Sequence, residues 1–150
     1  MQKSAEKALS FLKKDHLLDS EYVYMLDVVE EEEMMMRNRL PQHFPKGLME
    51  DAYLLDYIGS AEIAWKYEAA IAVVKFYAAN EYVILGGDVY EIRNEHIRPT
   101  LDNWYFSSKN PFSQEDLSLS RDKAILYIEN YYLKNGDDYG YTLVVRSLKQ

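Results

Sequence analysis

The spacing of apolar residues predicts helices over most of the first half of the chain. Ser4 can cap a helix over residues 4–14, and a second helix is expected to begin at Asp19 or Ser20. The apolar residues of this second helix recur every three or four positions, and it continues through the run Glu30–Glu33. A further short helix is predicted over residues 48–57.

The middle of the chain predicts a short strand followed by a helix. Residues 61–65 are predicted as a short strand, in preference to the start of a helix. Residues 66–80 then predict a helix with apolar side chains almost all round, as in a helix buried at the centre of a fold.

The second half is richer in residues that favour strands. Residues 82–92 predict one strand that is interrupted by Gly86-Gly87, where a bulge or a close backbone approach is expected. A hairpin turn at residues 93–96 leads into a return strand over residues 97–106. Pro99 cannot donate a ladder hydrogen bond, so this strand should face an edge of the sheet.

Helix signals then return before the last strand. Ser113 and Asp116 match a capping box, and the helix that they begin should run to about Leu133 and end at Asn135-Gly136. Residues 139–148 predict the final strand. The order of elements indicates an α+β fold, in which a helical N-terminal half precedes a small, mainly antiparallel sheet made of the hairpin and a C-terminal strand and packed with helices.

Composition adds limits to this picture. The 150 residues suit one domain over residues 1–150, and the absence of cysteine excludes disulfides and fits a reducing cytoplasm. No apolar run approaches the roughly 20 residues of a membrane span, so no membrane contact is expected. The net charge of −8 argues against direct nucleic-acid binding and leaves a basic partner open. A second copy of the chain stays open as a partner.

The search for catalytic and metal sites yields one pair of residues. The three histidines stand far apart without a ligand spacing, so neither a metal nor another cofactor is expected. The hairpin should set Asp88 opposite Leu101 or Asp102, and two close carboxylates can share a proton in acid–base catalysis. This makes a small carboxylate-dependent hydrolase the alternative function, although a structural role for the pair is favoured.

Two surface patterns point instead to binding. The run Glu30–Glu33 is either a solvated helix face or an acidic patch for a basic partner, and Met34–Met36 beside it cannot all face one core. Tyrosine is in excess, with 14 residues against 5 phenylalanines, and many lie in the second half. Tyrosine is typical both of half-buried sheets and of interfaces.

One stretch of sequence resembles a known family. The segments Tyr82–Tyr90 (YVILGGDVY) and Asp102–Tyr105 (DNWY), with Ile63-Ala64-Trp65 upstream, resemble Immunity protein 40 of bacterial polymorphic toxin systems, over about residues 50–145. The resemblance implies a protein that binds and neutralises a cognate toxin without catalysis, and it implies no catalytic residues.

A basic nuclease is one toxin that an acidic inhibitor would suit, because acidic side chains can take the place of phosphates. Our candidate partner-binding residues combine the acidic and aromatic positions singled out above: Asp88, Tyr90, Asp102, Asn103, Trp104, Tyr105, Glu30, Glu31, Glu32 and Glu33.

Overall fold

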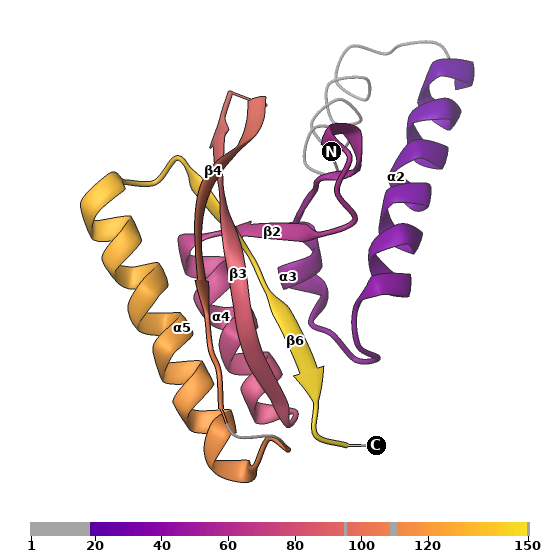
Figure 1. Cartoon of the computed structure of the whole chain (residues 1–150). Coiled ribbons are helices and arrows are strands. Elements are labelled where there is room, and N and C mark those ends of the chain that lie inside the picture. The colour runs from indigo at the N-terminus through magenta and orange to yellow at the C-terminus, as the bar shows by residue number, and fades with distance from the viewer. Residues whose placement is uncertain (1–18, 95, 109–110, 150) are drawn as a thin grey trace. The chain divides into compact units, whose positions relative to one another are not determined.

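The computed structural model describes residues 19–94, 96–108 and 111–149, so the helix predicted over residues 4–14 lies outside the described part (Figure 1). The chain divides into two compact units, residues 1–63 and residues 64–150. None of the helices in the described ranges is long and apolar enough to cross a bilayer.

The first unit is mainly helical. Its elements are α2 (Asp19–Arg39), α3 (Lys46–Glu50), the two-residue strand β1 (Tyr53–Leu54) and a 3₁₀ turn (Asp56–Ile58). The helix predicted over residues 48–57 is therefore wrong beyond Glu50. Its C-terminal half becomes the strand and the 3₁₀ turn because Leu54 and Leu55 are buried in succession and Asp56 is held by an ion pair with Arg39.

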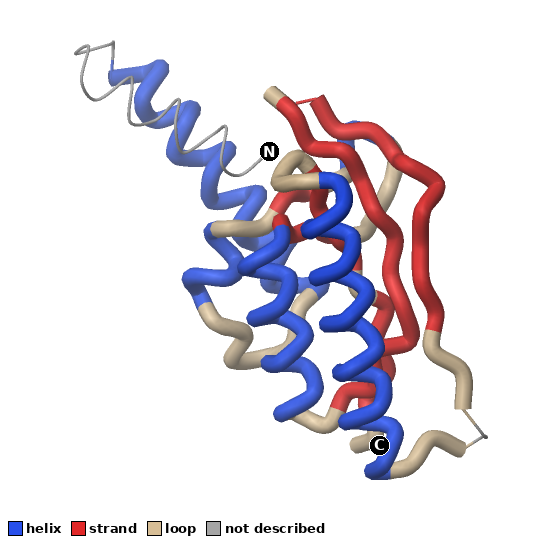
Figure 2. The backbone as a smooth tube through the Cα atoms, turned by 90° about the vertical axis from the view of Figure 1, so that its left-hand side faces the viewer, coloured by secondary structure: helices blue, strands red, loops and turns tan. Residues whose placement is uncertain are grey.

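The second unit is a sheet covered by two helices. Strand β2 (Ile63–Lys66) begins at the unit boundary, and the elements that follow it are α4 (Tyr67–Ala79), β3 (Tyr82–Arg93), β4 (His96–Tyr105), α5 (Gln114–Asn135), β5 (Tyr139–Thr142) and β6 (Val144–Ser147). The strand order is β2-β5-β3-β4, and β6 pairs with the first part of β3. Figure 2 shows α4 and α5 side by side against one face of these strands.

The sheet corrects the predicted fold class. It has six strands rather than a hairpin and one C-terminal strand, and every pairing with a defined register is antiparallel. Strand β2 confirms the short strand predicted over residues 61–65, but β1 lies where a helix was predicted, and the long helix α5 lies in the second half. The error arose because the two-residue strand β1 carries too few residues to show a period, and because the last predicted strand is two strands.

The long strand β3 explains why the C-terminal strand divides. Its register with β6 shifts between Ile84 and Gly86, so a bulge lies at the glycine pair as predicted. Before the bulge β3 pairs with β6, and beyond it with β5. A 12-residue strand needs ladder partners along its whole length, and two short strands separated at Leu143 supply them.

Several local predictions are confirmed. The hairpin turns between Arg93 and His96, and Pro99 lies on β4, which pairs only with β3 and forms an edge. Helix α5 begins with the predicted capping box, in which the Ser113 backbone N–H donates to Asp116 Oδ2 at 2.8 Å. It ends at Gly136, whose φ is 90°.

Candidate partner-binding surface on β4 and α5

The register of the β3–β4 hairpin decides which candidate residues meet. Near the turn, Tyr90 pairs with Pro99, but farther along Asp88 pairs with Asn103. One residue of β3 therefore faces three residues of β4, and the extra length is taken up at Leu101, which has a φ of 70° and a side chain that is 86% exposed. The Thr100 hydroxyl donates to the Val89 carbonyl at 2.8 Å and holds the bulge against β3.

This bulge corrects the predicted pairing of two carboxylates. Asp88 lies opposite Asn103, not opposite Leu101 or Asp102. The Asp102 carboxylate accepts a hydrogen bond from the Tyr131 hydroxyl of α5 at 2.8 Å, whereas the Asp88 backbone N–H donates to the Thr142 hydroxyl of β5 at 2.9 Å. The two residues are thus held by different elements, and the register on which the hydrolase alternative was based is absent.

An aromatic layer fills the space between α5 and the sheet. Trp104 is only 6% exposed and stacks on Tyr127 with ring centroids 4.9 Å apart. Tyr131 contacts Tyr139 and Tyr141 edge to face, at 5.3 and 6.0 Å. Two of the candidate binding residues, Trp104 and the buried Tyr90, are consequently core residues in this structure.

Burial changes the acidity of this layer. Desolvation, together with the hydrogen bond to Asp102, raises the pKa of Tyr131 to about 12. Desolvation likewise raises the pKa values of Tyr127 and of the fully buried Tyr141. The phenols are therefore held in their neutral form, which suits a packing role better than proton transfer near neutral pH.

The remaining candidates of β4 form an exposed edge. Asp102 and Asn103 are exposed, and the Tyr105 ring is 70% exposed. Lys123 of α5 places its ammonium 5.1 Å from the centroid of this ring and donates to the Tyr105 backbone carbonyl. The bulge, Pro99 and this lysine all hinder the addition of another strand, so β4 offers side chains rather than a ladder.

The glutamate run lies in the other unit, on α2. Glu30 and Glu31 are exposed and Glu32 is half-buried, while Glu33 accepts a hydrogen bond from Arg37 at 2.8 Å. Of the three adjacent methionines, Met34 is exposed and Met36 is fully buried, which confirms that they do not share one environment.

Helix α5 carries exposed residues that sequence reasoning did not select. Leu119, Leu126 and Leu133 all face solvent. Their regular spacing of seven residues is visible in the sequence, but leucines in an amphipathic pattern are ordinarily expected in the core. Only the structure shows that they lie outside.

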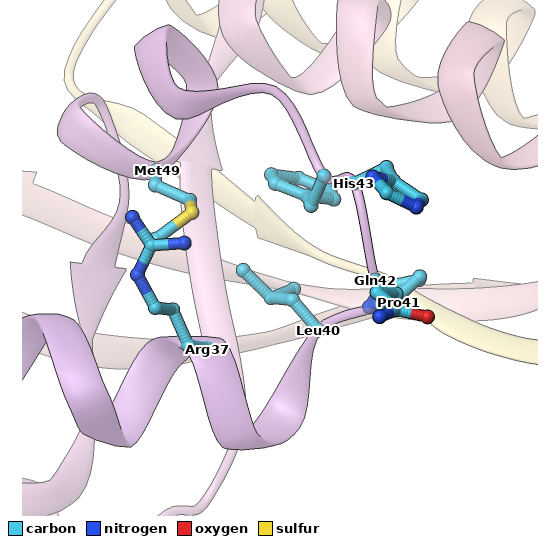
Figure 3. A pocket seen from close by; sticks show the side chains of 7 residues that line it. Arg37, Leu40, Pro41, Gln42, His43 and Met49 are labelled. Atoms are coloured by element: carbon cyan, nitrogen blue, oxygen red, sulfur yellow. The ribbon is translucent and has the colours of Figure 1, made fainter.

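Two hollows in the described part of the chain lie outside the segment Asp102–Tyr105. One, of about 350 Å³, lies in the first unit and is shown in Figure 3; it is lined by Arg37, Leu40, Pro41, Gln42, His43, Phe44 and Met49. The other lies at the tip of the β3–β4 hairpin, beside Glu91, Arg93 and Arg98. Among the residues that the structure describes, no group of three or more acidic or histidine side chains could hold a metal ion.

Comparison with known proteins gives one match. The family model for Immunity protein 40 matches residues 54–145, which confirms the resemblance stated from the sequence. No curated protein matches the chain, and no solved structure does. The matched residues include β4 and α5 entirely, whereas α2 with its glutamate run lies outside them.

Proposed function

Because the chain belongs to the Immunity protein 40 family, we propose that it binds a cognate bacterial toxin and neutralises it by occupying the toxin's surface, without catalysing a reaction. The observation that carries this proposal is the family match over residues 54–145, more than half of the chain. The lack of cysteine fits a protein that does this in a reducing cytoplasm.

We place the toxin contact on the exposed part of β4. Asp102, Asn103 and Tyr105 present a carboxylate, an amide and an aromatic ring within one short segment of the matched region. Tyrosine is enriched at interfaces because it covers a large apolar area and still keeps a polar tip. Asp88, Tyr90 and Trp104 support this segment from behind, and Glu30–Glu33 would at most add attraction at longer range.

The charge of the chain indicates the chemistry of the toxin. A net charge of −8 speeds the encounter with a basic protein, and a nuclease is basic wherever it holds phosphate. A basic nuclease is therefore the class of toxin that we propose.

Co-expression tests the proposal. Family membership leads us to expect a toxin gene beside this gene, and that gene is placed under an inducible promoter, with and without the wild-type chain. We expect the toxin alone to stop growth and the wild-type chain to restore it. Continued killing in cells that contain the folded wild-type chain would refute neutralisation.

The stoichiometry of inhibition separates binding from catalysis. When the purified toxin is titrated with the chain, an inhibitor that occupies its surface abolishes activity at a fixed molar ratio that does not change with time. Progressive inactivation by far less than one equivalent would instead indicate an enzyme, and would return the hydrolase alternative to consideration.

A further inference from the structure

Helix α5 buries a face with two small residues, Ser120 and Ala124, and exposes three of its leucines. The residues that it buries are Asp116, Ser120, Ala124 and Ile128, each four positions after the last. Leu119, Leu126 and Leu133 are 49%, 60% and 79% exposed. The Ile84 backbone N–H of β3 donates to the Ser120 hydroxyl at 3.0 Å, so this face of α5 lies against the sheet and the three exposed leucines are not core residues of this unit.

The leucines form one stripe along the helix. Seven residues complete two turns to within about 20°, so Leu119, Leu126 and Leu133 lie nearly in line. At a rise of about 1.5 Å per residue, the stripe is about 21 Å long, or four turns of a partner helix. Neighbouring leucines of the stripe are about 10.5 Å apart, so one partner helix of this length can contact all three.

An acidic stripe runs beside the leucines. Glu115, Asp122 and Glu129 have the same spacing of seven, and each stands four residues before a leucine. Four residues place neighbours on the same side of a helix, about 40° apart. Asp122 contacts the adjacent Arg121 at 2.9 Å, but both side chains are exposed, and such pairs contribute little.

The opposite flank of the leucine stripe carries a positive charge and lies beside β4. Lys123 lies between Leu119 and Leu126 in the sequence and reaches β4, where it contacts Tyr105. The outer face of α5 is therefore continuous with the exposed edge of β4, and both lie within the residues that match the family.

We propose that the outer face of α5 docks an amphipathic helix of the toxin, whose apolar residues cover Leu119, Leu126 and Leu133 and whose lysines or arginines meet the acidic stripe. This inference rests on the proposed function and extends its contact surface from β4 onto α5. Pairing of amphipathic helices through their apolar faces is a common mode of recognition, and the charge pattern commits the partner helix to a basic one.

Charge disfavours an antiparallel pair of two copies of this chain as the occupant of this face. In a two-fold antiparallel pair of α5 helices centred on Leu126, equivalent flanks of the two copies face each other. The acidic stripe of one copy would then lie against that of the other, and like charges in contact are unfavourable. A basic helix faces no such repulsion.

The leucine arm of the test compares two double variants. The probe is an inactivated form of the toxin that the wild-type chain neutralises. Leu126→Gln with Leu133→Gln removes the two most exposed leucines of the stripe, and Met34→Gln with Val144→Gln removes exposed apolar residues from other elements. We expect the leucine variant to weaken toxin binding by about 30-fold or more, as loss of interface anchors does. The control variant should stay within about threefold of the wild type.

The charge arm uses triple variants of equal net charge. Glu115→Lys, Asp122→Lys and Glu129→Lys reverse the acidic stripe, whereas Asp27→Lys, Glu50→Lys and Asp51→Lys reverse exposed acids of the first unit that lie outside the glutamate run. We expect the stripe variant to associate with the toxin at least about tenfold more slowly at low salt, and to lose most of its salt dependence. In the control variant, the association rate and its salt dependence should both change much less.

The outcomes separate the two proposals. A wild-type chain that does not bind the toxin removes both of them. A wild-type chain that binds, together with a folded leucine variant that binds equally well, overturns only the docking on α5. A leucine variant that loses self-association but keeps its affinity for the toxin would identify a second copy as the occupant. That result would also overturn the docking of a toxin helix on α5.

Discussion

At the scale of single residues, Gly86 and Gly87 of β3 lie so close to neighbouring strands that neither position has room for a side chain. A Cβ on Gly87 would lie 1.9 Å from the Thr142 carbonyl oxygen and 2.5 Å from the Trp104 ring. Gly86 has a φ of 149°, and a Cβ there would lie 2.2 Å from the Trp104 carbonyl oxygen. The pair permits both the bulge and the close approach that the sequence suggested as alternatives.

Replacing Gly87 should therefore be severe. We expect Gly87→Ala to lower the free energy of unfolding by about 3 kcal/mol, because backbone and a packed indole must both move. Gly47→Ala is the matched control, since a Cβ on Gly47 meets nothing within 4 Å. Gly47 lies in helix α3, where alanine is favoured over glycine. The free energy of unfolding of Gly47→Ala should therefore equal that of the wild type or slightly exceed it.

Urea denaturation measures the difference between the two glycine variants. The midpoint of Gly87→Ala should fall well below that of the wild type, while the midpoint of Gly47→Ala should not fall. Equal midpoints for the two variants would show that the space at Gly87 is not needed.

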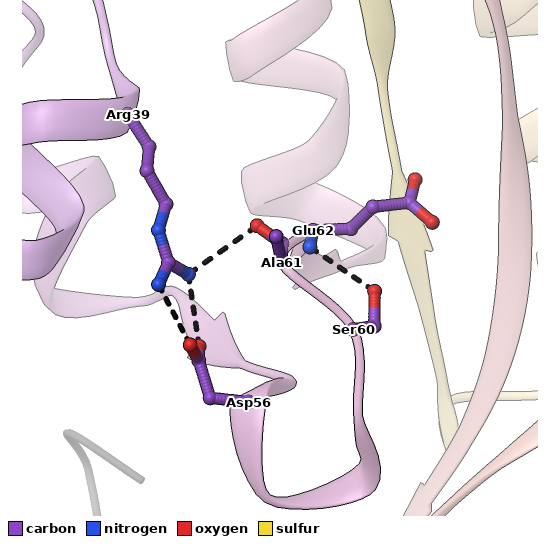
Figure 4. Close-up of polar contacts among 5 residues, drawn as sticks. All are labelled: Arg39, Asp56, Ser60, Ala61 and Glu62. Atoms are coloured by element: carbon purple, nitrogen blue, oxygen red, sulfur yellow. Dashed lines mark hydrogen bonds and ion pairs between the residues drawn. The ribbon is translucent and has the colours of Figure 1, made fainter.

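At the scale of elements, one ion pair connects the end of α2 to the turn after β1. Arg39 donates through its two terminal nitrogens to the two carboxylate oxygens of Asp56, at 2.8 and 2.7 Å, and also to the Ala61 carbonyl at 3.3 Å (Figure 4). The guanidinium lowers the pKa of Asp56 below its ordinary value of 3.8. The pair stabilises the fold above that value and is lost as the pH falls through the lowered pKa.

We expect Arg39→Lys to cost up to about 1 kcal/mol at neutral pH, because an ammonium cannot form the two parallel hydrogen bonds and the pair is partly exposed. Arg37→Lys, two residues earlier, changes only a single exposed contact with Glu33 and should have little effect. The stability loss of each variant is measured by thermal unfolding at neutral pH and at pH values lowered below 3.8. A loss for Arg39→Lys that persists after Asp56 is protonated would contradict the ion-pair origin.

At the scale of the whole molecule, tyrosine packing affects stability at high pH. Burial raises the pKa values of Tyr77 and Tyr131 to about 12, and that of Tyr141 further. The ordinary value is 10.0, so the native state retains these protons when the unfolded chain has lost them. This contribution to stability is complete below pH 10 and is lost as the pH rises through the raised pKa values.

Alkaline titration of the tyrosinate absorbance tests this packing. In the native chain, part of the tyrosinate absorbance should develop only near pH 12, where Tyr77 and Tyr131 titrate. Tyr131→Phe should reduce this late part of the absorbance change. A single step near pH 10, with the fold intact by circular dichroism, would contradict the burial of these phenols.

The sequence by itself determined those features that depend on residues close together along the chain. The capping box at Ser113 and Asp116, the glycine that ends α5 and the turn after Arg93 were all predicted at their correct places. Each is formed by hydrogen bonds or backbone angles within a few residues, so local side chains specify it. The family resemblance was also available at this level, because it rests on segments that can be read directly.

Only the tertiary structure decided how these elements meet. The bulge at Leu101 moved Asp88 opposite Asn103, and a pattern of alternating residues carries no sign of such an insertion. The burial of Trp104 depends on Gly87 and on Tyr127, which are 17 and 23 residues away. The same packing turned the small residues of α5 inward and its leucines outward. Which apolar residues form the core depends on what fills the space beneath each helix, and that is settled by residues distant in the sequence.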